Sequence, residues 1–230
     1  IDATTLFHEF GHALHGLSSN VSYPSLAGTN VARDYVEFPS QLLEFWVSVP
    51  EVLNKYAVHY QTGKPIPPEL IAKVLKAKTF NQGFDTVEYL SSAIVDLRMH
   101  LADPSTLDVA AFERETLEAI GMPRQIAMRH RPPHHTHVFS GGYYASAYYS
   151  YMWSEVLDAD AFAAFEETGD IFDPAVAKRL RDHVLSAGGS RDPAELYVAF
   201  RGRLPDAGAL PVNRTVASSD TSPDSLIHTK

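Results

Sequence analysis

The segment His8-Glu9-Phe10-Gly11-His12 limits what this chain can be more than any other feature of its sequence. On an α-helix, residues four positions apart share a face, so the imidazoles of His8 and His12 can reach one ion. Neutral imidazole binds zinc well, and Glu9, one step round the helix, can contact a water on the ion. Two idle histidines on a solvated face are disfavoured, because the motif lies within an apolar helical pattern. The motif therefore predicts a helix that supplies two ligands of an open metal site.

The composition narrows the chemistry that such a site can carry. The chain has no cysteine, which excludes disulfides, zinc–thiolate sites and thiol nucleophiles. Its 230 residues can bury a core, and a content of 45% hydrophobic and 20% charged residues is ordinary for a globular domain. A net charge of −9 argues against a nucleic-acid partner. The sequence also has no apolar run of about eighteen residues, so no membrane span is expected.

Apolar residues recur at helical spacing along most of the chain, so we expect a mainly α fold. Residues 18–33 are rich in Ser, Asn and Gly and predict a short loop or a hairpin between the first two helices. Pro39 is compatible with the second helix only in its first turn. Within 84–101, an apolar stripe from Phe84 to Leu101 is expected to face the core. Helices are expected over residues 4–17, from Asp34 to Pro50, and over 51–61, 69–79, 84–101, 108–120, 144–167, 174–187 and 193–203.

An open catalytic zinc site needs a third protein ligand besides two histidines. A further histidine in the same segment is not favoured, because His15 and Gly16 stand in the opposite order to the metzincin pattern. A carboxylate from the second helix fits better. Glu37 lies in the expected first turn of that helix, and the intervening loop is long enough to fold the helix back against the first. Glu44, two turns further on, stays a rival, and a surface role for Glu37 is the alternative.

Three stretches of the sequence resemble one known family. They are FHEFGHALHG at 7–16, DYVEFPSQLLEFW at 34–46 and HVFSGGYYASAYYSYMWSEVL at 137–157. The chain resembles the C-terminal catalytic part of the thimet-oligopeptidase family of zinc metallopeptidases, which includes oligopeptidase A and the bacterial peptidyl-dipeptidases, or dipeptidyl carboxypeptidases. The resemblance implies a multi-helix, zincin-like catalytic subdomain that holds one Zn²⁺ per chain. It also implies His8, His12 and Glu37 as the zinc ligands and Glu9 as the general base.

The third stretch carries tyrosines at regular spacing. Tyr144, Tyr148 and Tyr151 are four and three residues apart, which predicts that they line one face of the helix over 144–167. A neutral tyrosine hydroxyl can donate a hydrogen bond to the oxyanion that forms during peptide hydrolysis. The alternative for an aromatic stripe at this spacing is core packing.

The resemblance assigns roles within this stretch. It implies catalytic roles for Tyr144, Tyr151 and His137, and substrate-binding roles for Tyr148, Gly141 and Gly142, the glycines lying in a flexible loop. Tyr143 departs from the family pattern, in which a second small residue is usual at this position. The neighbouring His134 and His135 are interpreted as solvated loop residues.

The expected function follows from the resemblance, which covers residues 1–205. We expect zinc-dependent hydrolysis of short peptides, either by release of C-terminal dipeptides or by oligopeptidase action. The alternative is a zinc-binding but catalytically inactive fragment that lacks the N-terminal half of the substrate channel, and a helical interaction module is a third option. Residues 206–230 are rich in Ser and Thr and are expected to form a disordered or divergent tail.

The expected partners are short peptides, with neither nucleic acid nor membrane among them. In a longer parent protein, an N-terminal region is expected to pack against this part. The expected location is cytoplasmic.

Overall fold

A computed structural model describes residues 2–206, 208 and 210 and confirms a mainly α fold. Within these residues, the only β-type pairing is an isolated bridge between Val58 and Pro65. The α-helices are α1 (Asp2–Leu17), α2 (Phe38–Glu44), α3 (Pro50–Tyr56), α4 (Pro68–Lys78), α5 (Gln82–Leu101), α6 (Val109–Ala119), α7 (Ser150–Glu166), α8 (Pro174–Leu180) and α9 (Pro193–Arg201). Short 3-10 helices cover Pro24–Leu26, Phe45–Ser48, Pro132–His134 and Thr136–Phe139, and a π-helical segment, Arg181–Leu185, continues α8.

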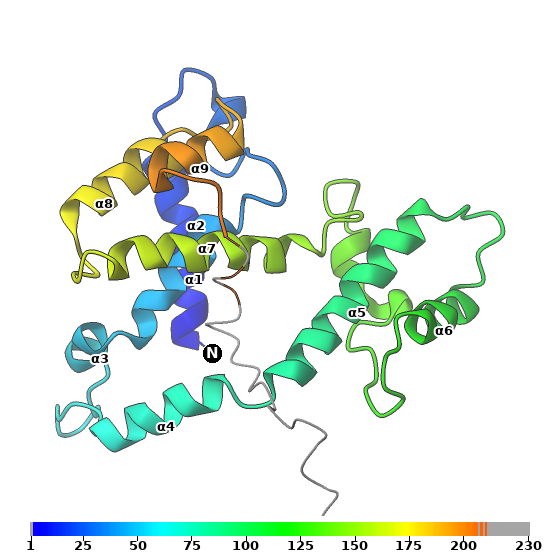
Figure 1. Cartoon of the computed structure of the whole chain (residues 1–230), viewed down its shortest axis with the longest axis horizontal. Helices are drawn as coiled ribbons and strands as arrows, with labels where there is room; N and C mark the ends of the chain where they lie inside the picture. Colours follow the sequence, from blue (N-terminus) through cyan, green and yellow to red (C-terminus); the bar gives the residue numbers. More distant parts are fainter. Residues whose placement is uncertain (1, 207, 209, 211–230) are drawn as a thin grey trace, which may run out of the picture.

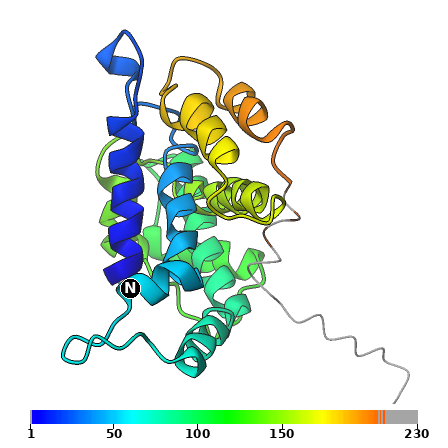
Figure 2. The same ribbon diagram turned by 90° about the vertical axis from the view of Figure 1, so that its left-hand side faces the viewer.

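Two groups of helices make up the molecule. In the first group, α2 lies between α1 and α7, while α8 and α9 pack on the other side of α7 (Figures 1 and 2). Its core joins large side chains such as Phe38, Phe165 and Tyr197. The second group contains α5 and α6 around Val95, Met99 and Met128, and lies to the right in Figure 1. The chain enters it through α4 and leaves it through the segment that precedes α7.

Most expected helices are present, but the second begins later than predicted. We expected it to start near Asp34, whereas α2 starts at Phe38 and Glu37 occupies its N-cap position. The reason is Pro39, which lies in the first turn of α2, where no backbone N–H is needed. A helix starting at Asp34 would have left Pro39 in its interior, without a donor for the carbonyl of Tyr35. Of the two forms expected for residues 18–33, the loop is correct, with one 3-10 turn.

The apolar stripe of α5 was expected to face the core, and this prediction is wrong. Phe84 is 44% exposed, Leu97 44% and Leu101 79%. The buried face of α5 consists instead of small and polar residues together with Val95 and Met99, namely Ser91, Ser92, Ala93 and Asp96. Helical periodicity indicates which residues share a face, but it does not indicate which face the rest of the chain covers.

The pieces of the chain that the structure describes include no helix both long enough and apolar enough to cross a membrane. Residues 206, 208 and 210 are the described part of the expected tail, and the rest of the 206–230 prediction lies outside the described residues.

His15 gives the folded chain a specific dependence on pH. Its ring is completely buried in α1, and neither ring nitrogen has a hydrogen-bond partner. Burial, with a smaller contribution from the charge of His12, lowers the pKa of His15 from 6.5 to about 4. The unfolded chain therefore takes up a proton below pH 6.5 that the folded chain does not. Stability that is fully present above pH 6.5 is lost as the pH falls towards 4.

We expect the variant His15→Leu to lose this pH dependence. Between pH 7 and pH 5 the wild-type chain should lose about 2 kcal/mol of unfolding free energy more than the variant. Urea denaturation at both pH values, in the presence of a chelator, measures the difference. The control is His134→Leu, which replaces an exposed histidine and should leave the wild-type dependence unchanged. Equal losses in wild type and His15→Leu would contradict the prediction.

Candidate metal centre

A glycine allows the two helices that carry the motif residues to approach closely. Gly11 of α1 faces the first turn of α2, and a Cβ at this position would lie 2.5 Å from the Cα of Ser40 and 2.8 Å from the carbonyl oxygen of Pro39. No side chain fits at such distances, so glycine is required for this contact. The contact brings Glu37, at the N-terminal end of α2, opposite the face of α1 that carries the histidines.

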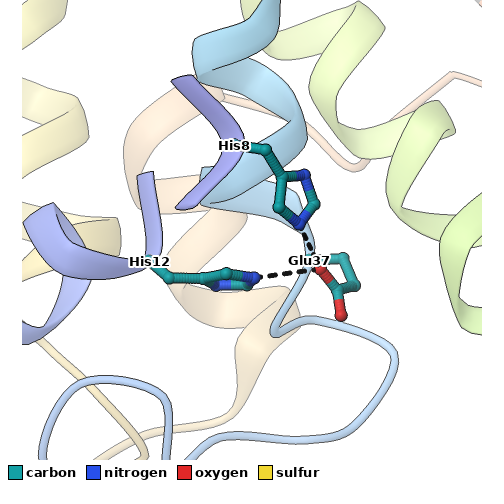
Figure 3. A group of neighbouring side chains, drawn as sticks. All are labelled: His8, His12 and Glu37. Atoms are coloured by element: carbon teal, nitrogen blue, oxygen red, sulfur yellow. Dashed lines mark ion pairs between the residues drawn. The ribbon is translucent and has the colours of Figure 1, made fainter. Parts of the chain in front are cut away.

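The side chains of His8, His12 and Glu37 converge at this contact (Figure 3). The Nε2 atoms of His8 and His12 lie 3.3 and 3.2 Å from Oε2 of Glu37. Zinc ligands bound at 2.0–2.1 Å in tetrahedral geometry lie about 3.3 Å from one another, so the spacing and the donor atoms both fit this ion. Within the described residues, no other group of three or more His, Asp or Glu side chains brings its ligand atoms within 4.8 Å.

Glu44, the rival carboxylate, contacts a different atom of the same cluster. Its Oε1 lies 2.8 Å from Nδ1 of His8, on the side of the ring opposite the Nε2 that faces Glu37. A carboxylate on the second nitrogen fixes the tautomer and the orientation of a metal-binding histidine. Glu44 is therefore placed to orient His8, and Glu37 is placed to share an ion with it.

The charges of the cluster are strongly coupled. Hydrogen bonds to Glu37 and then to Glu44 raise the pKa of His8 to about 9, against the opposing effect of burial. Burial alone would raise the pKa of Glu37, but hydrogen bonds to His12 and His8 outweigh it and hold that pKa well below its usual range. A metal ion that binds at neutral pH must therefore displace a proton from His8.

Glu37 is held in place by its own neighbours as well. Its side chain is almost buried, and the hydroxyl of Ser40 donates to Oε2 at 3.2 Å and to the backbone carbonyl at 2.8 Å. Nη1 of Arg33 lies 3.4 Å from Oε1 of Glu37. Glu9, the expected general base, follows His8 on α1, and its side chain is exposed.

The tyrosine stretch has a different backbone from the one predicted. We expected a helix over 144–167, but α7 begins at Ser150, so Tyr144 and Tyr148 precede the helix. Ser146 has φ +58°, a left-handed conformation that no α-helix can continue through. The carboxylate of Asp96 on α5 accepts hydrogen bonds from two backbone N–H groups of the segment, and this stabilises the non-helical path.

The predicted residues nevertheless come together around His137. The hydroxyl of Tyr151 lies 3.1 Å from Nε2 of His137, and the ring centres of Tyr144 and Tyr148 lie 4.9 and 5.9 Å from the centre of the His137 ring. Burial, with a smaller effect of the Arg33 charge, lowers the pKa of His137. One helix face does not bring these rings together; a loop and the first turn of α7 do.

Arg33 joins this aromatic cluster to the carboxylate of Glu37. Its guanidinium lies 4.6 Å from the ring centre of Tyr144 and 6.0 Å from that of Tyr151, while it also pairs with Glu37. The sequence analysis did not single out Arg33. Its position four residues before a candidate ligand was the available signal, because that spacing places the two side chains close together in a turn or helix.

Two further observations concern the loop before the tyrosines. His135 was interpreted as solvated, but it is buried, with its ring edge-on against Tyr148 at 4.6 Å and stacked on His130 at 5.0 Å. Gly141 has φ +130°, which disfavours any other residue, and a Cβ at Gly142 would meet open space.

The arrangement of the motif residues agrees with a comparison to known families. A sequence model of Peptidase family M3 matches residues 1–213. The chain belongs to Peptidase family M3. This confirms the resemblance to the oligopeptidase and dipeptidyl carboxypeptidase group.

Similar proteins within family M3 are all much longer than this chain. A dipeptidyl carboxypeptidase of Salmonella typhimurium is 42% identical over 208 residues, which are 89% of this chain and 30% of that protein. Oligopeptidase A of Haemophilus influenzae is 39% identical over 212 residues, 91% and 31% of the two chains. A thimet-like oligopeptidase of Dictyostelium discoideum is 34% identical over 212 residues, 90% and 31%. This M3 chain therefore spans about 30% of the length of these relatives.

The close approach at Gly11 makes a testable prediction for this M3 chain. In Gly11→Ala, the new Cβ must push α1 and α2 apart, because the atoms it meets belong to the backbone. We expect the unfolding free energy to fall by about 3 kcal/mol, as overpacking does. Zinc affinity should fall as well, because Glu37 moves away from both histidines. Urea denaturation and zinc titration measure the two effects.

Gly16→Ala is the matched control, because a Cβ at Gly16 in the same helix meets nothing within 4 Å. It should leave zinc binding unchanged and stabilise α1 by about 0.5–1 kcal/mol. Equal zinc affinity in the Gly11 and Gly16 variants would show that the helix contact does not position Glu37.

Proposed function

We propose that this M3 chain carries the catalytic part of a zinc peptidase that hydrolyses peptide bonds in short peptides. The observation that carries the proposal is the convergence of His8, His12 and Glu37 at the α1–α2 contact, beside Glu9. The names of the relatives, dipeptidyl carboxypeptidase and oligopeptidase A, support two modes of action, which are release of C-terminal dipeptides and cleavage of oligopeptides.

His8, His12 and Glu37 would hold one Zn²⁺ per chain, a role that their nitrogen and oxygen donors and their spacing support. When bound, zinc supplies a Lewis acid that polarises the scissile carbonyl and lowers the pKa of a bound water. Glu44 would keep His8 in the required tautomer through its contact with Nδ1.

The remaining roles belong to this chain's own side chains. The carboxylate of Glu9 accepts the proton of the attacking water and then delivers it to the leaving amine. The hydroxyls of Tyr144 and Tyr151 donate hydrogen bonds to the oxyanion of the tetrahedral intermediate. Burial raises the pKa of Tyr151, so its hydroxyl keeps the proton that it must donate at neutral pH. His137, which contacts Tyr151, assists at the same position.

The substrate lies along the loop that leads to these tyrosines. Tyr148, Gly141 and Gly142 would bind the peptide, since Tyr148 shares a cavity of about 510 Å³ with His137 and Tyr151. The glycines leave the approach to this cavity free of side chains.

Activity would depend on the rest of a longer protein. The chain spans about 30% of its relatives, the apolar stripe of α5 is exposed, and an apolar cavity of about 450 Å³ opens beside Phe7, Leu43 and Leu180. A further N-terminal region packed on these surfaces would bury them and complete the substrate channel. Without it, the chain would bind zinc but hydrolyse peptides poorly, because substrate positioning supplies much of the rate. The expected cytoplasmic location stays a prediction.

Metal analysis and peptide digestion of the full-length protein and of residues 1–230 test the proposal. We expect one zinc per chain in both, and hydrolysis by the full-length protein that a chelator abolishes and added zinc restores. A peptide with a free C-terminus, compared with its C-terminal amide, separates dipeptide release from oligopeptidase cleavage. Absence of bound zinc from both proteins, or chelator-resistant hydrolysis, would overturn the proposal.

A further inference from the structure

Asp96 is a buried carboxylate that the proposed reaction does not use. It lies on the buried face of α5 and is 4% exposed. Its Oδ1 accepts a hydrogen bond from the backbone N–H of Ser146 at 3.2 Å, and its Oδ2 accepts one from the N–H of Tyr148 at 3.0 Å. Both donors belong to residues 143–149, which we call the tyrosine loop. A single side chain from a distant helix therefore holds two points of this loop.

The backbone of the tyrosine loop needs such support. Ser146 adopts φ +58°, which is unfavourable for a residue with a side chain and persists only where surrounding interactions enforce it. The hydrogen bonds to Asp96 come from Ser146 itself and from the second residue after it. They stabilise the left-handed turn over a helical path, in which the same N–H groups would bond to backbone carbonyls.

Other contacts place Asp96 and complete the attachment of the loop. Nδ1 of His100, one turn further along α5, lies 2.8 Å from Oδ1 of Asp96. The hydroxyl of Tyr89 donates to the carbonyl oxygen of Tyr148 and accepts from the N–H of Met152 at 3.3 Å. The rings of Tyr89 and Tyr148 stack with centres 5.1 Å apart. The loop is thus held on its N–H side by Asp96 and on its carbonyl side by Tyr89.

We propose that Asp96 is a positioning residue that fixes the tyrosine loop so that Tyr144 and Tyr148 stand against His137. The role rests on the proposed function, because it matters for the reaction only if these tyrosines take part. Asp96 acts through the loop backbone, and its own side chain is turned to the loop N–H groups. Its removal would release the turn at Ser146 and let the tyrosine rings move away from His137.

Amide hydrogen exchange of the full-length protein tests the hold on the loop without any activity assay. In Asp96→Ala, exchange within residues 143–149 should be about 10- to 100-fold faster, because hydrogen bonds to a charged acceptor are lost. Asp108→Ala is the matched control. Asp108 also accepts two backbone N–H bonds, from Ala110 and Ala111 at the start of α6, outside the tyrosine loop. This variant should accelerate exchange in α6 alone. Unchanged exchange of the loop in Asp96→Ala would overturn the proposal.

Kinetics test whether the hold on the loop serves the reaction. Asp96→Asn keeps the size of the side chain and serves if the alanine variant does not fold. We expect kcat for peptide hydrolysis to fall by about 10- to 100-fold with a smaller change in KM, and the Asp108 variant to match wild type. In a Tyr144→Phe, Tyr151→Phe background, Asp96→Asn should cost less than about twofold more, because it acts through the same tyrosines.

The outcomes separate this proposal from the proposed function. Full and independent losses in the combined variant would show that Asp96 only supports the fold, and would overturn its positioning role. If the wild-type protein with zinc hydrolyses no peptide, the proposed function fails, and the exchange rates of the loop alone decide whether Asp96 holds it.

Discussion

Replacing Glu9 with Gln should remove peptide hydrolysis while zinc stays bound. The amide has the same size as the carboxylate but cannot accept the proton of the attacking water. General-base catalysis contributes about 10²- to 10⁴-fold, so kcat/KM should fall by at least about 10²-fold. His8, His12 and Glu37 are untouched by the change, so zinc content should stay at one per chain. Steady-state kinetics on a short peptide and metal analysis of the full-length protein measure the two quantities.

Glu69→Gln provides the matched control for this result. Glu69 lies in the first turn of α4 and is exposed, as Glu9 is on α1. The same chemical change at that position should leave kcat/KM within about twofold of wild type, as for a surface substitution. If Glu9→Gln kept wild-type turnover, another group would have to serve as the base, and the assignment of Glu9 would be wrong.

Substitutions at Glu37 and Glu44 should separate a metal ligand from the residue that orients one. Glu37→Gln removes the anionic oxygen that faces both Nε2 atoms, and we expect zinc affinity to fall by more than about 100-fold. Glu44→Gln keeps an oxygen that can accept from Nδ1 of His8, so the loss should be nearer tenfold, the lower end for partners of a metal ligand. Competition titration against a chelator of known affinity measures both losses.

Each of the two variants controls for the other, because both remove one negative charge from α2 or its N-cap. Circular dichroism and urea denaturation should show both proteins folded. A larger loss of affinity in Glu44→Gln than in Glu37→Gln would make Glu44 the ligand. Equal losses would mean that charge alone, and not the placement of Glu37, governs binding.

The relation between His8 and His12 could be predicted from sequence because it depends only on the helical repeat. The choice between Glu37 and Glu44 could not, since both lie on or beside one helix and either could face the first. The contact of Gly11 with the backbone of Ser40 settles how α2 lies against α1. In that arrangement Glu37 faces Nε2 of both histidines, and Glu44 meets Nδ1 of His8.

The tyrosine stretch shows where the same reasoning fails. Spacing by four and three residues predicts one helix face, but Tyr144 and Tyr148 precede α7. What overrides the local preference is a carboxylate 50 residues away in sequence, that of Asp96, whose bonds to Ser146 and Tyr148 favour a left-handed turn. The signal for this was absent from the stretch itself.

The exposed stripe of α5 makes the same point for burial, because periodicity identified an apolar face without telling what covers it. Local patterns of this chain therefore predicted its helices, its metal-binding motif and its family, all of which depend on residues a few positions apart. The third candidate ligand, the path of the tyrosine loop and the roles of Arg33 and Asp96 depend on contacts between distant segments. Such contacts form only when helices pack, and no local preference along the chain encodes which of several similar residues will meet.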